Sequence, residues 1–278
     1  MKRADGKKRT PSHPKAQAQA QTTGGVAEQE PERSALLRWV VIGGMVLAVF
    51  AVAGLVGSFV RDYKDKKLAP PASAAGPSAL AVPIYGHASV TLTVYEDMRN
   101  PGSLQFSQTF DTTLAQLVAS GTVNIYYREV AGVDASQGGN GSLYAGNALA
   151  CAQDAKDFPQ YRQVLLANQP TSGNDTFGSK AKLIDLAKKV SGLDTDVFRQ
   201  CVNAGTHNVW VKDSTSAFKK LGQGDVPVLT MSVLPQTTSQ FSVIYSSTQP
   251  LTPKQLTSRV IAAAQTAPTT SPSATPTS

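Results

Sequence analysis

One uncharged segment limits the architecture of this chain more than any other feature. It begins at Trp39, ends at Val60 and contains 22 residues without a charge or a proline. A helix of this length spans the hydrocarbon layer of a membrane, which is about 30 Å thick. The alternatives are a buried core helix, which rarely stays uncharged for so long, and a cleaved signal peptide, which has a shorter apolar stretch. We therefore predict an uncleaved signal anchor that contacts membrane lipid.

The basic residues on either side of the segment predict its orientation. Residues 1–38 hold eight Lys and Arg against four Asp and Glu, whereas only four Lys and Arg follow closely after Val60. An excess of basic residues favours the cytoplasmic side of a membrane. We expect a single-pass protein of the cell membrane, with a cytoplasmic N-terminus and an extracytoplasmic C-terminal domain.

Composition divides the rest of the chain. Residues 1–38 and 266–278 lack apolar periodicity and are predicted to be disordered. Residues 61–82 include an Ala/Pro-rich stretch that is typical of a linker. Residues 83–265 are numerous enough for one domain with a proper core. The net charge of +7 is concentrated in the leader, so the domain is not expected to bind nucleic acid.

The order of the apolar patterns predicts an α/β domain. Alternation over 90–95 predicts a strand, a stripe over 106–118 a helix, and alternation over 122–130 a second strand. This order favours a parallel pair of strands joined by a crossover helix. Further helices are predicted over 144–152, 161–168, 179–190, 198–202 and 209–221, strands over 226–233 and 241–245, and a closing helix over 253–264.

Several segments resemble the DsbA family of disulfide oxidoreductases. VTLTVYEDMRNPGSLQF at 90–106 resembles the first strand and active-site turn of the family, and GTVNIYYREV at 121–130 resembles its second strand. Residues 148–205 resemble its helical subdomain, and LGQGDVPVLTM at 221–231 resembles the loop and strand that carry its cis-proline. The resemblance implies a thioredoxin-like fold with a helical insertion, preceded here by one transmembrane helix.

The dithiol of the family is missing from this chain. Its C-P-x-C motif aligns with Asn100, Pro101, Gly102 and Ser103. Exchange between disulfides begins with attack by a thiolate, which neither an amide nor a hydroxyl can replace. Asn and Ser are instead common helix N-cap residues, so we interpret the motif as a structural cap with no catalytic residue. A serine nucleophile at Ser103 is the alternative, although no His–Asp partnership is evident.

The two cysteines lie elsewhere, at Cys151 and Cys201, each on the apolar stripe of a predicted helix. In an oxidising compartment we expect a structural disulfide between them, with two buried free thiols as the alternative. The three histidines are scattered and offer no metal-ligand spacing. We therefore expect no metal site and no cofactor.

A binding groove is one implication of the resemblance. It implies that Pro227 follows a cis peptide bond after Val226 and faces the turn at 100–103, where family members pair with extended substrate backbone. The groove then binds an extended peptide or an envelope protein, or else the loop is kept only for folding. Glu96 and Asp97 precede the turn and are expected to be solvated.

These features favour a redox-inactive, membrane-anchored DsbA-like domain that acts in protein binding or scaffolding. The alternative is a thiol-disulfide oxidoreductase that assists disulfide formation in the cell envelope. Such an enzyme would use Cys151 and Cys201, or the thiols of a partner.

Overall fold

The structure is a computed structural model that describes residues 68–171, 173–233 and 241–267, together with five earlier residues: Val40, Ile42, Gly44, Val49 and Phe50. The chain divides into two units, residues 1–56 and 57–278. The predicted disordered ends lie almost wholly outside the described residues.

The predicted transmembrane span falls in a part of the chain of which little is described. Its described residues are the five named above, which are helical and exposed. Within the described parts of the chain, no helix has both the length and the apolar character needed to cross a membrane. The rest of the span, from Trp39 to Val60, lies outside the described residues.

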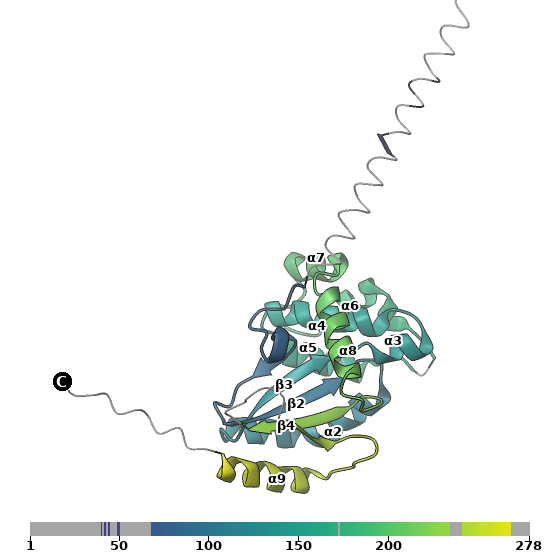
Figure 1. The fold of residues 1–278 in the computed structure, drawn as a ribbon. Helices are drawn as coiled ribbons and strands as arrows, with labels where there is room; N and C mark the ends of the chain where they lie inside the picture. The colour runs from purple at the N-terminus through teal and green to yellow at the C-terminus, as the bar shows by residue number, and fades with distance from the viewer. Residues whose placement is uncertain are drawn as a thin grey trace, which may run out of the picture. The chain divides into compact units, whose positions relative to one another are not determined.

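A mixed five-stranded sheet forms the centre of the second unit (Figure 1). Its strands are β1 (Val82–Ile84), β2 (Val90–Glu96), β3 (Val123–Glu129), β4 (Val228–Val233) and β5 (Ser242–Tyr245), in the spatial order β1-β3-β2-β4-β5. β2 and β3 are parallel, as the strand–helix–strand pattern predicts, and the other neighbouring pairs are antiparallel.

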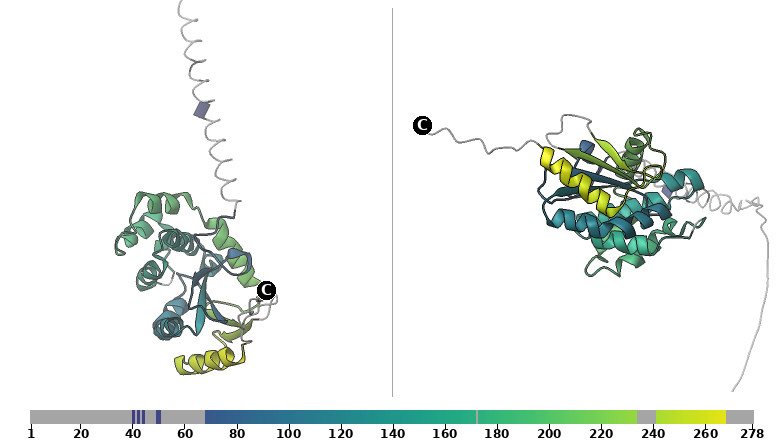
Figure 2. Two further views of the ribbon diagram at one scale, coloured as in Figure 1. Left: turned by 90° about the vertical axis from the view of Figure 1, so that its left-hand side faces the viewer. Right: turned by 90° about the horizontal axis from the view of Figure 1, so that it is seen from below.

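Helices cover both faces of the sheet. α2 (Pro101–Ala119), the crossover between β2 and β3, lies beside α9 (Pro253–Thr266) on one face (Figures 1 and 2). α8 (Asn208–Lys219) contacts β3 from the other face. β2 therefore lies in the middle of a layered core, and Val90, Leu92 and Val94 are fully buried. This burial explains its apolar, β-branched sequence.

A block of helices between β3 and α8 forms the predicted insertion. Its central helix is α4, whose residues from Ala145 to Ala152 are buried and which contacts most of the others. The members of the block are α3 (Gly132–Gln137), α4 (Gly141–Asp154), α5 (Phe158–Ala167), the short 3₁₀ helix η2 (Thr176–Gly178), α6 (Lys180–Ala187) and α7 (Asp196–Ala204). The short helix α3 lies in a region for which the sequence predicts no element.

The linker prediction for 61–82 differs from the structure at its C-terminal end. Leu80, Ala81 and Val82 are buried, and β1, a strand that the sequence does not predict, begins at Val82 inside the predicted linker. The preceding residues include the 3₁₀ helix η1 (Pro77–Ala79). Pro83 lies inside β1, which it can do because β1 is an edge strand. This stretch joins the domain because its apolar residues complete the core.

Hydrogen bonds also fasten the chain before β1 to the helices of the domain. Asp154 Oδ1 accepts from the Ala72 N–H at 2.7 Å, and the Trp210 indole donates to the Ala79 carbonyl at 2.8 Å. His207 Nδ1 lies 2.6 Å from the Ala69 carbonyl oxygen. The described part of the predicted linker is thus held against α4 and α8.

Candidate functional site

The candidate site begins where β2 ends and α2 starts. Asn100 is the N-cap of α2, and its side-chain oxygen accepts from the Gly102 N–H at 2.7 Å. Pro101 occupies the first helical turn, where a missing N–H costs nothing. The predicted cap is therefore present, and four consecutive residues at 100–103 form one compact helix start.

Ser103 closes the same turn from inside. Its side chain is fully buried, and its hydroxyl oxygen accepts from the Asp97 N–H at 3.1 Å. The Ser103 N–H in turn donates to the Asn100 carbonyl at 2.9 Å. A serine nucleophile needs a histidine that accepts its proton. Both ring nitrogens of His207 have oxygen partners other than Ser103, namely the Ala69 carbonyl and the Asp154 carboxylate. A buried hydroxyl that holds a backbone turn is poorly placed to attack a substrate, which disfavours the alternative of a serine nucleophile.

The loop before β4 lies against this turn, as the resemblance implies. The Val226–Pro227 peptide bond is cis. Pro227 is so close to Gly102 that a Cβ at position 102 would lie 2.9 Å from Pro227 Cδ. Only glycine therefore fits at position 102 without displacing the proline. The structure brings together the two sets of residues expected at the site, 100–103 and 226–227.

Asp225 links the two sides of the site. Its Oδ2 accepts from Asn100 Nδ2 at 3.0 Å, and its Oδ1 accepts from the Val226 N–H at 2.8 Å. Asp225 itself is exposed. The backbone donor next to the cis-proline is thus already occupied, but by a side chain that solvent or a ligand can displace. We call this bridge of Asn100, Asp225 and Val226 the Asp225 latch.

Two carboxyl groups lie side by side beneath the turn. Glu96 and Glu129 end the parallel strands β2 and β3 and are directly paired in register. Arg162 of α5 donates two hydrogen bonds of 2.7 Å to Glu96 and one of 2.8 Å to Asp111 of α2. Burial and the adjacent Glu96 raise the pKa of Glu129. A buried carboxyl next to another keeps its proton more readily, and the positive charge of Arg162 offsets this only in part.

Asp97 is also buried, so the expectation that Glu96 and Asp97 are solvated is wrong. Both side chains are fully buried. Burial raises the pKa of Asp97 to about 6, although its carboxylate accepts from the N–H groups of Arg99 and Val133. Glu96 is the last residue of a central strand and Asp97 follows it under the helix start, so neither can reach solvent.

Cys151 and Cys201 form the predicted disulfide. The bond joins α4 to α7, with Cα atoms 5.9 Å apart. Cys151 is buried and Cys201 partly so. Among the described residues there is no free cysteine. The structure thus supports the disulfide over the alternative of two free thiols.

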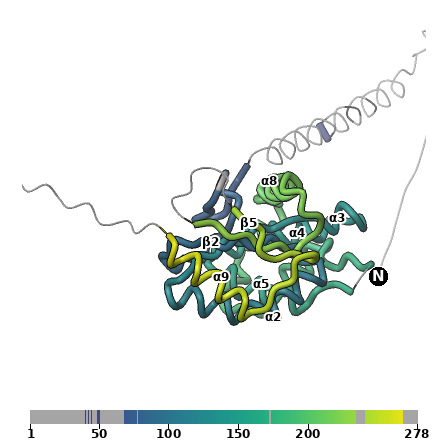
Figure 3. The backbone as a smooth tube through the Cα atoms, turned by 60° about the horizontal axis from the view of Figure 1, so that its bottom comes forward, coloured from purple at the N-terminus to yellow at the C-terminus, as the bar shows by residue number. Residues whose placement is uncertain are grey.

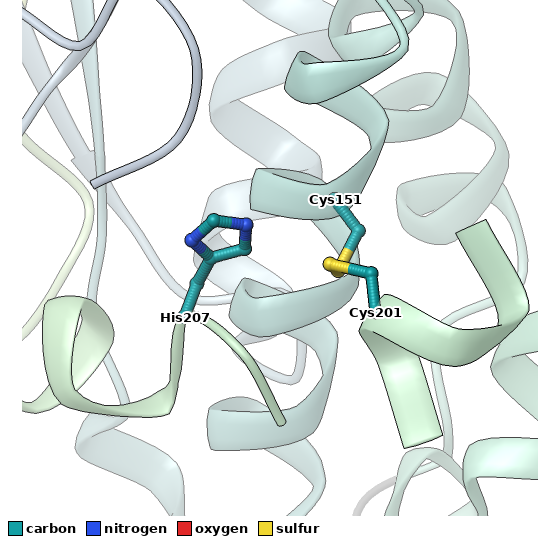
Figure 4. A group of neighbouring side chains, drawn as sticks. All are labelled: Cys151, Cys201 and His207. Carbon is teal, nitrogen blue, oxygen red and sulfur yellow. A yellow bond between two sulfur atoms is a disulfide. The ribbon is translucent and has the colours of Figure 1, made fainter. Parts of the chain in front are cut away.

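His207 lies beside this disulfide, as Figure 4 shows. A ring nitrogen of His207 and the two sulfur atoms lie within 4.8 Å of one another. However, the sulfurs are bonded to each other, and the ring nitrogens of His207 face the Ala69 carbonyl and, at 2.9 Å, Asp154 Oδ2. The atoms that could bind a metal ion are therefore already bonded or paired with oxygens. The group fits a structural contact better than a metal site.

Sequence reasoning misses three residues of the site, namely Asp225, Arg162 and Gln169, whose side-chain N–H donates to the Asn100 carbonyl at 3.0 Å. Asp225 directly precedes Val226, so its place in the loop is a signal that could have been used. Arg162 and Gln169 come from α5 and the residues after it, far from the turn in sequence. Only the packing of the insertion brings them to the site.

A family model described as "Thioredoxin" matches residues 83–233, which is more than half of the chain. The matched region includes the helix start, the insertion and the cis-proline loop. No protein in the set of curated proteins matches the chain in a sequence comparison.

Solved structures of disulfide oxidoreductases share the fold. Oxidised DsbA of Mycobacterium tuberculosis is 21% identical, with a TM-score of 0.51, and the match covers 73% of this chain and 91% of that one. MdbA, a thiol-disulfide oxidoreductase of Actinomyces oris, is 17% identical, with a TM-score of 0.54 and coverage of 73% and 94%. Oxidised BdbD of Bacillus subtilis is 16% identical, with a TM-score of 0.54 and coverage of 71% and 100%. At these identities the likeness establishes the fold alone.

Proposed function

Because this chain belongs to the thioredoxin family, in its DsbA-like branch, we propose that its domain binds extended polypeptide without exchanging disulfides. The binding site is the surface formed by the start of α2 and the loop at Val226 and Pro227. The domain acts as a binding or scaffolding module.

One observation supports the proposal that the domain does not exchange disulfides. Both positions that align with the family's cysteines are used for the backbone of the turn, since Asn100 caps α2 and Ser103 accepts from the Asp97 N–H. Thiol–disulfide exchange needs a thiolate at such a position. The Asn100 amide and the buried Ser103 hydroxyl stabilise this helix start, but neither provides the thiolate sulfur that attacks a disulfide.

The binding mode follows from the Asp225 latch. An extended peptide pairs with a protein through backbone donors and acceptors at an open edge. Here the Val226 N–H is bound to the exposed Asp225 side chain at 2.8 Å, so a peptide carbonyl must replace that carboxylate. The latch therefore lowers the affinity for peptide and keeps the donor satisfied when the site is empty.

The alternative function, a disulfide oxidoreductase, requires a thiol that a substrate can reach. The described chain offers only the Cys151–Cys201 disulfide, which joins two helices of the insertion. Insulin reduction separates the two functions. We expect the full chain to show no turnover above a blank, and turnover comparable to a genuine oxidoreductase would reject the binding-module proposal.

Peptide binding is tested with the full chain and two aspartate variants. Fluorescence anisotropy with a panel of labelled, unstructured peptides measures affinity. Asp225→Ala frees the Val226 N–H and is expected to raise affinity several-fold. Asp213→Ala is the matched control, since Asp213 is an exposed aspartate on α8. Absence of saturable binding in both the parent and the Asp225→Ala chain, or an equal gain in the control, would reject the proposal.

We also propose that the domain is displayed outside the cell membrane by the segment from Trp39 to Val60. The support is the uncharged length of the segment and the basic leader before it. Protease added to spheroplasts is expected to digest the domain and to spare the leader. Protection of the domain together with loss of the leader would reverse the orientation.

A further inference from the structure

A pocket of about 340 Å³ opens between α2, α5 and the β1–β3 edge of the sheet, away from the site described above. α2 and α5 are in contact along this side (Figure 3). Most of the lining is apolar and comes from all three elements: Ile84, Ala115, Val118, Ala119, Ile125, Tyr127, Phe158 and Pro159. The lining includes no residue of the turn at 100–103 and neither Val226 nor Pro227.

The polar end of the pocket is formed by Asp111, Arg162 and Gln163. The guanidinium of Arg162 is already committed, with two hydrogen bonds to Glu96 and one to Asp111 Oδ2. Asp111 Oδ2 also accepts from the Ser107 hydroxyl. The other oxygen of this carboxylate, Oδ1, is buried and has no hydrogen-bond partner.

The charge at this end is negative. The one guanidinium, Arg162, faces two carboxylates, Glu96 and Asp111. Glu129, which is paired in register with Glu96, can only add to the negative charge if it ionises. An anionic ligand would be repelled, whereas an ammonium group would balance the excess negative charge beside Asp111, whose side chain is 25% exposed.

We propose that this pocket binds a small amphiphilic amine, with its apolar body on Ala115, Val118 and Phe158 and its ammonium group on the Asp111 carboxylate. The site is separate from the peptide-binding surface. Its chemistry is selective, because an apolar wall sets the shape of the ligand while one acidic end sets its charge.

Three probes with the same body test the charge preference. They are 4-phenylbutylamine, the neutral 4-phenylbutanol and the anionic 4-phenylbutanoate, titrated by calorimetry into the full chain in maltoside micelles. We expect the amine to bind about fivefold more tightly than the alcohol, because a partly exposed ion pair adds an affinity gain of about that size. The carboxylate is expected to bind most weakly.

Three variants locate the site. Ala115→Phe fills the pocket and is expected to abolish saturable binding of every probe. The heat that remains when a probe is titrated into this variant therefore measures partition of the probe into the micelles. Gln108→Phe places the same ring on an exposed position of α2 outside the pocket and is expected to change nothing. Asp111→Asn removes the charge and is expected to equalise the affinities for the amine and the alcohol.

Each remaining outcome overturns the proposal. Lack of saturable amine binding in the parent chain would mean that the pocket is not a ligand site. Binding that persists in a folded Ala115→Phe chain would place it elsewhere. Equal affinity for the amine and the alcohol in the parent chain, or a preference for the carboxylate, would reject the ligand class. Should Ala115→Phe fail to fold, the Asp111→Asn comparison decides alone.

Discussion

Two adjacent acidic residues, Glu96 and Asp97, show how strongly a side chain depends on its partners. Glu96 shares two hydrogen bonds with the Arg162 guanidinium, a charged partner that compensates its burial. The partners of Asp97 are neutral, namely the N–H groups of Arg99 and Val133 and the side chain of Ser142. Burial therefore dominates at Asp97 and raises its pKa to about 6.

The first prediction concerns the pH dependence of stability. Since the pKa of Asp97 is raised to about 6 in the folded state, folding favours its protonated form. Its contribution to stability is complete below about pH 4 and is lost as the pH rises through about 6, by about 3 kcal/mol in total. Urea unfolding should show that the parent chain loses about 3 kcal/mol of stability relative to the Asp97→Asn chain as the pH rises over this window. A constant difference would contradict the prediction.

The second prediction concerns the buried ion pair. Arg162→Met leaves Glu96 buried without a charged partner, and we expect a loss of about 3–5 kcal/mol in the free energy of unfolding at pH 7. Arg199→Met is the control, because the pair of Arg199 with Asp194 is less buried, with side chains 43% and 16% exposed, and we expect a much smaller loss. Chemical denaturation measures both variants, and similar effects in the two would show that burial does not govern the Arg162 pair.

At the scale of the element, α2 begins in a capped turn that carries no thiol. Asn100 caps its first turn, and Phe106, Phe110 and Leu114 bury one stripe against the core. The free N–H groups of a helix start favour a negative charge there. Pro227 lies against Gly102 and closes the other side. Two substitutions therefore separate this helix start from one that carries a dithiol.

The third prediction restores that dithiol. The double variant Asn100→Cys, Ser103→Cys is expected to carry a thiol at position 100 with a pKa below the free value of about 8.5, because the helix start stabilises its thiolate. Absorbance at 240 nm against pH measures the titration. Gln108→Cys, on the exposed middle of α2, is the control and should titrate normally. An unshifted thiol at position 100 would show that this helix start does not stabilise a thiolate.

At the scale of the whole molecule, a disulfide links two helices of the insertion to each other and does not involve the sheet. The disulfide joins α4, which contacts most of the insertion, to α7 across 50 residues of sequence. His207 and Asp154 then hold the chain that leads into β1. The described stretch before the sheet is thus coupled to the insertion.

The fourth prediction tests this tie. Replacing both Cys151 and Cys201 with Ala is expected to lower the free energy of unfolding by about 4 kcal/mol, the loop-closure entropy of a 50-residue loop. Urea unfolding of the oxidised parent and the double variant measures it. A loss below about 1 kcal/mol would mean that the insertion is held by packing alone.

The sequence by itself determined the features that depend on neighbouring residues. The β2–α2–β3 unit, the cap at Asn100 and the helical insertion follow from periodicity and capping, which act over a few positions. The pairing of Cys151 with Cys201 followed from their positions on predicted helix faces in an oxidising compartment. The likeness of whole segments to one family added the place of Pro227. All of these features can be predicted from the order of residues along the chain.

The tertiary structure alone decided which polar groups lose contact with water. Arg162 reaches Glu96 across 66 residues, and β1 joins the sheet beside β3 despite its proline. Asp97 and Glu129 are buried because strands and helices from distant parts of the chain close over them. Burial is a property of the assembled layers, and the pKa of a carboxyl group follows burial more closely than it follows its own sequence.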